Sequence, residues 1–395
     1  MIAKAVDGTR LFIVEDEGVV YAHDRQEIFA LNTTATYLWC QIEEQRDKDT
    51  VLRDYAATFG IAEETAAAQV NGVLETFHEI GLIHLPDRKA LTVPARSKPV
   101  FDRTPPYEIP PLRARPIVAQ KSYQLLETSF LVRFSDLEQV KWVDPILKNF
   151  AVAEAAESAV VVDLYHDNDE IRLYRSGEGV GKCDGLDKLA PLVLGCLWLP
   201  AIDNFGYFLN LHTGVVGHGD GCVLLPAAAG SGKSTTTAAL VKGGLHYLSD
   251  EVALIGEDCT IRTLPLAMCF KSTGWDIAGR YFDEIESLRA HLRSDGKIVK
   301  YYALPEQYRA DASRPYPVKA IIFPKYTPGT ATRIEALSKT QALDRMFREC
   351  VSIPSDLTEA QVSRLIEWIK GVDCHTLEFS DLDAAVATVH GVLDG

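Results

Sequence analysis

In the first eighty-five residues the hydrophobic positions follow a strand-like pattern first and a helical pattern afterwards. Three short runs rich in β-branched and aromatic residues are separated by acidic or glycine turn positions, which predicts a three-stranded meander. Three segments with apolar residues at helical spacing follow them. The predicted strands are residues 11–15, 18–24 and 27–32, and the predicted helices are residues 33–45, 50–59 and 62–80. This order predicts a small α+β domain over residues 1–85.

The pattern then changes twice. Eight prolines occur between residues 84 and 116 with little apolar periodicity, so residues 86–117 are predicted to form an extended linker. Beyond it, apolar strand-like runs and helical patterns are mixed, which predicts an α/β domain over residues 118–395. The predicted strands of this domain are residues 130–134, 159–164, 171–174, 222–225, 251–255 and 318–323.

A glycine-rich loop lies between a predicted strand and a predicted helix. Residues 227–237 read AAAGSGKSTTT, which is the pattern of a phosphate-binding P-loop, although Ala227 stands where that pattern has its first glycine. In such a loop, backbone N–H groups point at nucleotide phosphates, a lysine neutralises their charge and a hydroxyl holds Mg²⁺. The sequence therefore predicts binding of ATP or GTP with Mg²⁺. The expected binding residues are Ala229, Gly230, Ser231, Gly232, Lys233, Ser234 and Thr235.

Two acidic residues follow the next apolar run. Asp250 and Glu251 come directly after the segment YLS, and Asp250 lies seventeen residues after Lys233. A carboxylate at such a strand end can hold Mg²⁺, and a second one can accept the proton of an attacking hydroxyl. Ser234 and Asp250 are therefore the expected magnesium ligands, while the general base is left open between Asp250 and Glu251.

Composition narrows the class of partners. The formal net charge is −15 and the pI is near 5.2, which argues against broad binding to nucleic acid or to anionic membranes. No segment has the apolar length of a signal peptide or a membrane span. The eight cysteines form no C-x-x-C pair, which suits free thiols rather than a zinc site. A cytoplasmic protein is expected, and a homo-oligomer is left open.

The segment VVYAHDRQEIFALNTTATYLWCQI, with a helix-rich stretch after it, holds a distinctive combination of residues, namely Val20, Tyr21, Ile28, Phe29, Leu31, Asn32, Ala35, Trp39, Gly81 and Leu82. With these, residues 8–85 resemble the PqqD family, the peptide chaperones of pyrroloquinoline quinone biosynthesis. Domains of this type also recognise leader peptides of ribosomally made natural products. The resemblance implies a winged-helix-like domain that captures a peptide or small protein as an added strand.

The same resemblance implies which residues receive the peptide. They would be Glu27, Ile28, Phe29, Ala30 and Leu31, on the edge strand of the sheet. The predicted helix over residues 62–80 would form the other wall of the site. Phe29, Leu31, Trp39 and Leu82 are also expected in the core, so capture would use the backbone of the strand and its outward-facing residues.

A second resemblance covers the chain from about residue 123 onward. The stretch 209–256 combines the glycine-rich loop and the acidic pair with His212, which lies twenty-one residues before Lys233. It resembles the HPr kinase/phosphorylase superfamily, which is distinct from eukaryotic-type protein kinases. The resemblance implies that His212 holds the transferring group or tunes a neighbouring carboxylate. The family has two adjacent aspartates where this chain has Asp250 and Glu251.

A cation that stabilises transition-state charge is also expected downstream of these residues. The candidates are Arg262, Lys271, Arg293, Lys297 and Lys300, of which Lys271 and Lys300 are favoured by their place beside apolar runs.

These features together predict a Mg²⁺-nucleotide-dependent kinase of the HPr kinase type. Its first domain would capture a peptide, and its second would phosphorylate a Ser or Thr hydroxyl of a natural-product precursor or small protein. The expected catalytic residues are His212, Lys233, Asp250 and Glu251. Two alternatives stay open. One is a nucleotide-switched peptide carrier without kinase activity, and the other is a kinase for a small metabolite, which would not need residues 1–85.

Overall fold

A computed structural model describes the chain as two compact units. The residues it describes are 2–89, 91, 108–112, 116–167, 169–228, 230–347, 351–352 and 356–394. Unit 1 comprises Met1–Pro99 and Ala336–Cys374, and unit 2 comprises Val100–Glu335 and His375–Gly395. Most of the predicted linker, residues 86–117, lies outside the described residues.

Unit 1 contains the predicted three-stranded sheet and the three predicted helices, and both predictions are confirmed. The strands, paired antiparallel in the order given, are β2 (Thr9–Val14), β3 (Glu17–Ala22) and β4 (Glu27–Leu31). The helices are α1 (Thr33–Glu43), α2 (Lys48–Phe59) and α3 (Glu63–Glu79). A short ladder of β1 (Lys4–Ala5) with β5 (Ile83–His84) ties the two ends of this module together.

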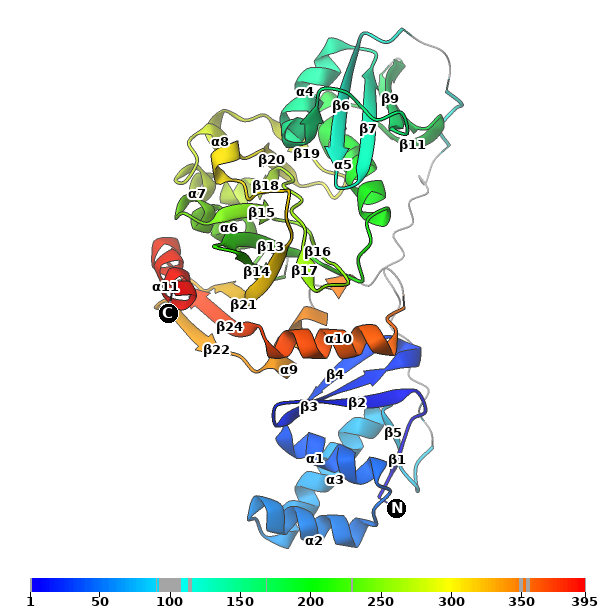
Figure 1. Cartoon of the computed structure of the whole chain (residues 1–395), viewed down its shortest axis with the longest axis vertical. Helices are drawn as coiled ribbons and strands as arrows, with labels where there is room; N and C mark the ends of the chain where they lie inside the picture. Colours follow the sequence, from blue (N-terminus) through cyan, green and yellow to red (C-terminus); the bar gives the residue numbers. More distant parts are fainter. Residues whose placement is uncertain are drawn as a thin grey trace. The chain divides into compact units, whose positions relative to one another are not determined.

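The sheet of unit 1 is buried on both faces. On one face, Val20 and Leu31 join the helices in a single core. On the other, Val19, Tyr21 and Ile28 are 0%, 1% and 5% exposed. Two helices from much later in the sequence cover this second face. Helix α9 (Lys339–Arg345) packs on β3 and β4, and α10 (Glu359–Lys370) packs on β2 (Figure 1).

Hydrogen bonds fix the later segment to the sheet. The Tyr21 hydroxyl donates to the Leu357 carbonyl at 2.6 Å, and the Leu357 N–H donates to the Gln26 side-chain oxygen at 2.6 Å. The predicted boundaries assign residues 336–374 to the second domain, whereas their contacts place them in unit 1. The physical reason is the outer sheet face, because residues 1–85 alone would leave Val19, Tyr21 and Ile28 open to water.

Unit 2 contains a six-stranded sheet in the order β11-β10-β9-β7-β6-β8, antiparallel except for the parallel pair β7 and β9. Its strands are β6 (Ala119–Leu125), β7 (Thr128–Phe134), β8 (Ala151–Val152), β9 (Val160–Asp167), β10 (Glu170–Arg175) and β11 (Glu178–Cys183). Helices α4 (Leu137–Leu147) and α5 (Leu186–Asp203) pack on it. None of the helices within the described ranges combines the length and the apolar character needed to cross a bilayer.

A second sheet of unit 2 places the glycine-rich loop at the end of a buried strand. Strand β14, which precedes the loop, is antiparallel to β13 and parallel to β21. The strands run in the order β15-β13-β14-β21-β17-β16-β12, and β24 joins β21 and β22. They are β12 (Leu209–Leu211), β13 (Thr213–His218), β14 (Gly221–Pro226), β15 (His246–Ser249), β16 (Ala253–Ile255), β17 (Thr260–Ile261), β21 (Tyr316–Tyr326), β22 (Arg333–Ala336) and β24 (Asp373–Phe379). This mixed sheet confirms the predicted α/β class.

The remaining elements of unit 2 surround the end of this sheet. A small sheet has the order β18-β20-β19. Its strands are β18 (Met268–Lys271), β19 (Ala290–Leu292) and β20 (Ile298–Tyr302), and the nearby helices are α6 (Lys233–Lys242), α7 (Trp275–Gly279), α8 (Glu284–Ser287) and α11 (Leu382–Asp394). The strand expected at 251–255 begins only at Ala253. The Ser249 hydroxyl accepts the Val252 N–H at 3.3 Å and holds Asp250 and Glu251 in a bend.

Candidate functional sites

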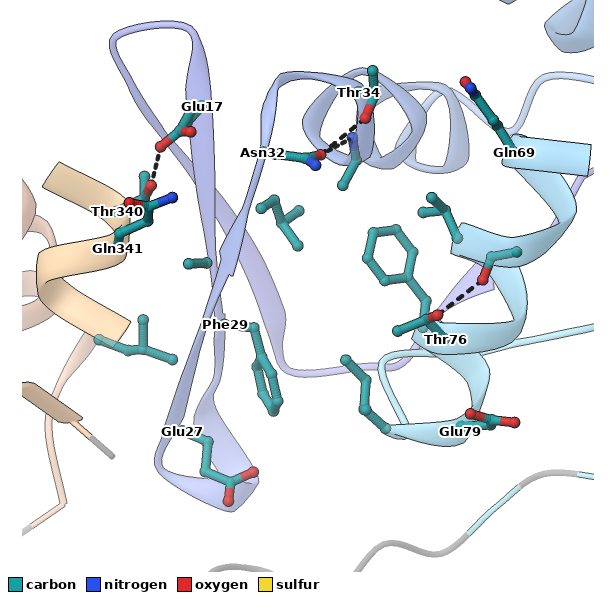
Figure 2. A pocket seen from close by; sticks show the side chains of 18 of the residues that line it. Glu17, Glu27, Phe29, Asn32, Thr34, Gln69, Thr76, Glu79, Thr340 and Gln341 are labelled. Atoms are coloured by element: carbon teal, nitrogen blue, oxygen red, sulfur yellow. Dashed lines mark hydrogen bonds between the residues drawn. The ribbon is translucent and has the colours of Figure 1, made fainter. Parts of the chain in front are cut away.

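A groove of about 1090 Å³ runs between strand β4 and helix α3 of unit 1. Figure 2 shows β4 with α3 on one side of it and α9 on the other. The groove is lined by all five residues of β4, by Gln69, Gly72, Val73, Thr76, Phe77 and Glu79 of α3, and by Thr340 and Gln341 of α9. The structure therefore brings the predicted receiving strand and the predicted opposite wall to one cavity.

Strand β4 is the edge of its sheet. It pairs with β3, and within the described parts of the chain no strand pairs with its other edge. Its side chains alternate, so that Phe29 is half-buried and points into the groove in Figure 2, while Ile28 lies on the face covered by α9. Leu31, Trp39 and Leu82 are core residues, as expected. Strand β4 therefore presents a row of backbone groups on its free edge, beside the Phe29 ring, to which a ligand can bind.

The α3 wall of the groove is open in its middle. A Cβ atom at Gly72 would meet no heavy atom within 4 Å, and the Thr76 hydroxyl donates to the Gly72 carbonyl at 2.9 Å. At one end, the Arg25 guanidinium lies 5.0 Å from the centre of the Phe29 ring and pairs with Glu27. The groove therefore has open space beside α3 at Gly72.

Helix α9 adds a contribution that the sequence did not reveal. Thr340 donates a hydrogen bond to Glu17 on β3, as drawn in Figure 2, and Gln341 and Phe347 also line the groove. No local motif marks residues 339–347 as part of a peptide site. Only the tertiary contact of α9 with β4 brings them there.

A second candidate site surrounds the glycine-rich loop of unit 2. Gly230 and Gly232 have φ values of 95° and 91°, a region that favours glycine, and α6 begins at Lys233 directly after the loop. Ala227 is 5% exposed and does not have a positive φ, so the turn accommodates an alanine there. Ala229 lies outside the described residues. Exposed N–H groups at a helix N-terminus are suited to binding a phosphate.

The side chain of Lys233 joins the two predicted catalytic segments. Its Nζ donates to the Asp250 carbonyl at 2.7 Å and lies 3.1 Å from His212 Nε2. Because an ammonium can only donate, Nε2 accepts and the proton of a neutral imidazole lies on Nδ1. Nδ1 then donates to the Glu251 carbonyl at 2.9 Å. Desolvation of the ring, together with the Lys233 charge, lowers the pKa of His212, which favours this neutral form.

Asp250 is a buried carboxylate without a hydrogen-bond donor. It is 1% exposed, and neither carboxylate oxygen has a hydrogen-bond partner among the described residues. Burial raises the pKa of Asp250 to about 7, which the Lys233 charge and the nearby Ser234 and Thr237 hydroxyls oppose. An unpaired buried carboxylate beside a hydroxyl fits a divalent cation. In the described parts of the chain no group of three or more His, Cys, Asp or Glu forms a self-contained metal site.

Replacing Asp250 with Asn should stabilise the protein at alkaline pH. The pKa of Asp250 is about 7 in the folded state and lies near 3.8 when unfolded, so its stabilising contribution is complete below about pH 3.8 and is lost as the pH rises from there to about 7. The free energy of unfolding of Asp250→Asn, relative to that of wild type, should be several kcal/mol larger at pH 8 than at pH 4. Urea unfolding of both proteins at the two pH values measures this. Parallel pH profiles would contradict it.

The loop opens onto a cavity of about 770 Å³. Its cationic lining residues are Lys233, Lys271, Arg280, Arg293 and Lys297, and its apolar and aromatic lining residues include Ile277, Tyr281, Tyr326, Phe379 and Leu382. His212, Ser234 and Glu251 line it as well. Arg280 and Tyr326 were not predicted, because they come from segments without a motif.

Lys300, one of the two favoured cations, has another role. Its Nζ donates to the carbonyls of Ile285 and Glu286 at 2.9 and 2.8 Å, and it lies 4.6 Å from the centre of the Trp275 ring. The side chain is 9% exposed and stabilises the end of α8, where helix carbonyls lack partners. Lys271 and Arg293 remain in the cavity as cations that can face an anionic ligand.

The first of these two sites lies in a small domain with a three-stranded sheet followed by three helices, in which a free strand edge faces the third helix. Residues 17–83, which run from β3 to β5, match the family model of PqqD, coenzyme PQQ synthesis protein D. This match confirms the expected PqqD-type domain, a type that recognises peptides during natural-product modification. No curated protein matches the chain.

Proposed function

We propose that the protein is a Mg²⁺-nucleotide-dependent kinase that captures a precursor peptide in the groove of unit 1 and phosphorylates a Ser or Thr hydroxyl of it at the loop of unit 2. One observation carries the proposal. Lys233, His212 and Glu251 line a cavity rich in cations at the N-terminus of α6, and Asp250 is buried beside it, in the same chain as a PqqD-type domain.

The peptide groove supports capture through the backbone. A leader segment added to β4 would gain main-chain hydrogen bonds along the free edge, and its side chains would alternate between the α3 wall with Phe29 on one side and the α9 side, where Thr340 and Gln341 line the groove, on the other. Glu17, Glu27 and Glu79 line the groove and favour a leader that carries basic residues.

If the leader binds as an added strand, the effect of N-methylation on its affinity should repeat every two residues along the leader. N-methylation of a leader amide that bonds to β4 should weaken binding by about 2–10-fold, because one hydrogen bond is lost, whereas the next amide, which faces away, should tolerate the methyl group. An N-methyl scan read out by fluorescence anisotropy tests this. A period of three to four residues would instead indicate a helical ligand and contradict strand addition.

The second site supports transfer of a phosphoryl group. Loop amides and Lys233 would hold the phosphates of the nucleotide, and Ser234 with Asp250 would hold Mg²⁺, which supplies charge stabilisation when bound. Of the two candidate bases, Glu251 lines the cavity, whereas Asp250 is buried behind it. Glu251 therefore would accept the hydroxyl proton. Neutral His212 positions Glu251 through its backbone carbonyl.

Both sites belong to one chain, which passes between the units after residues 99, 335 and 374. A peptide held in the groove of unit 1 is therefore tethered to unit 2, and tethering of this kind raises a local concentration to about the millimolar range. Weak contacts of the acceptor segment would then suffice for transfer.

Incubation with Mg²⁺ and γ-labelled ATP or GTP tests this function. Label on a candidate precursor peptide is the expected result. A nucleotide-dependent change in peptide affinity without label would instead identify a nucleotide-switched carrier. Label on small metabolites, unchanged after deletion of residues 1–85, would identify a metabolite kinase.

A further inference from the structure

A second cavity of unit 2, of about 1040 Å³, adjoins the cavity of about 770 Å³ at the glycine-rich loop, hereafter the nucleotide cavity. It lies between α5, the β10–β11 hairpin and the β18–β20 sheet, and Glu251, Cys269 and Arg293 line both cavities. The carboxylate to which the base role is assigned therefore stands at the junction of the two spaces. A group that enters through the second cavity reaches Glu251 from the side away from the glycine-rich loop.

One cation of the second cavity is available to a ligand. Lys182 pairs with Glu170 at 2.7 Å, Lys188 pairs with Asp184 at 2.5 Å, and Arg293 pairs with Asp295 at 3.3 Å. Arg175, half-buried at the end of β10, has no ion-pair partner among the residues that the structure describes. Arg175 lines the cavity together with Cys196 of α5.

The helix side of the cavity is apolar. Leu192, Trp198 and Leu199 of α5 line it and are only half-buried by the protein itself. Gly195 lies among them, and a Cβ atom built there would meet no heavy atom within 4 Å. The cavity thus joins an apolar wall, one unpaired guanidinium and a carboxylate at its inner end.

We propose that this second cavity is the acceptor site, and that it receives a peptide segment in which a carboxylate and an apolar side chain flank the reacting hydroxyl. The carboxylate binds Arg175, the apolar side chain packs on α5, and the hydroxyl reaches Glu251. This inference rests on the proposed function. The carboxylate could be an Asp or Glu side chain or the carboxyl terminus of the peptide.

The proposed reaction at the junction of the two cavities is the transfer of a phosphoryl group from the nucleotide to the peptide hydroxyl. The hydroxyl oxygen forms a bond to the γ-phosphorus while the bond from that phosphorus to the bridging oxygen of the nucleoside diphosphate breaks. The hydroxyl proton passes to Glu251, and the nucleoside diphosphate leaves with the bridging oxygen and its charge. The products are the phosphopeptide and the diphosphate.

Synthetic decapeptide pools with one fixed serine test the assignment on the full-length protein. One pool has a free carboxyl terminus, a second has an amide terminus, and a third has an amide terminus with a fixed Asp near the serine. Retention by the protein with ADP and Mg²⁺, and phosphate gained from ATP, are both measured by mass spectrometry. Comparison of the first and third pools distinguishes a terminal carboxylate from a side-chain carboxylate.

Two substitutions and one control probe the cavity. Arg175→Ala should lower the ratio of retention between pools with and without a carboxylate by about tenfold, because a charge-assisted hydrogen bond is lost. Gly195→Phe should fill the cavity and abolish the preference for carboxylate-bearing pools, together with phosphate transfer to them, while nucleotide affinity stays unchanged. Gly391→Phe is the matched control, since Gly391 also lies in a helix, α11, with open space around its Cβ position, and it lines neither cavity.

The outcomes separate this inference from the proposed function. Selective retention that both cavity variants lose, with no phosphate transferred, would uphold the acceptor cavity and overturn the kinase. Transfer that neither variant alters would uphold the kinase and overturn the cavity. Equal retention of all pools by the wild type would also overturn it.

Discussion

Lys233→Ala should lower phosphate transfer to a captured peptide by at least about 10²–10³-fold, the cost of removing one charge-stabilising donor at a reacting centre. The loss should be larger than that of any other single cation of the cavity. Lys233 alone combines a place at the α6 N-terminus with direct contacts to His212 Nε2 and the Asp250 carbonyl. Peptide affinity should stay near the wild-type value, because the groove belongs to unit 1. Single-turnover transfer and anisotropy measure the two quantities.

Lys242→Ala provides a matched control for this change. Lys242 ends the same helix, and its Nζ lies 5.4 Å from the Phe282 ring, outside the residues that line the nucleotide cavity. The Lys242→Ala variant should transfer phosphate at close to the wild-type rate. Asp250→Ala should be as inactive as Lys233→Ala. Near-normal transfer by Asp250→Ala would overturn the assigned magnesium site.

Gly72→Trp should weaken peptide capture by at least about 100-fold, which corresponds to about 2.7 kcal/mol of binding free energy. The indole would project from α3 into the groove where Gly72 leaves open space, and it would occupy the position of the added strand. Folding should not suffer, because tryptophan is a better helix former than glycine. Anisotropy with a labelled leader peptide measures the affinity, and circular dichroism checks the helix content.

Asn71→Trp is the control for the groove. Asn71 is the preceding residue of α3, is exposed and does not line the groove. The same side chain is therefore added one position away, and peptide affinity should remain within about twofold of wild type, as for most surface substitutions. Equal losses in the two variants would show that the peptide does not bind between β4 and α3.

The local elements of the protein could be read from the sequence because each has its own period or motif. Strands β2–β4 and helices α1–α3 follow the alternating and helical patterns closely, and caps such as Asn32 at α1 sharpen their ends. The packing of residues 336–374 on the outer face of the sheet could not be read in this way. An amphipathic helix such as α10 shows that it will cover an apolar surface but does not show which one.

The residues of the second site also fall into two groups, those that the sequence marks and those that it does not. Lys233, Asp250 and Glu251 are marked by spacing from the loop, and the structure places them with His212 at one point. Arg280 lines the same cavity from the turn that follows α7, where no motif marks it, and Lys300 was favoured although its ammonium is held by the carbonyls of α8. Side-chain direction decides these cases, and it depends on tertiary packing.

The most direct test of the account is mass spectrometry of candidate precursor peptides, with and without their leader segments, after incubation with the protein, Mg²⁺ and ATP or GTP. The account predicts a gain of one phosphate on a Ser or Thr of the leader-bearing peptide and a much smaller gain on the leaderless one. Peptide that binds the protein but never gains mass would contradict the proposed kinase.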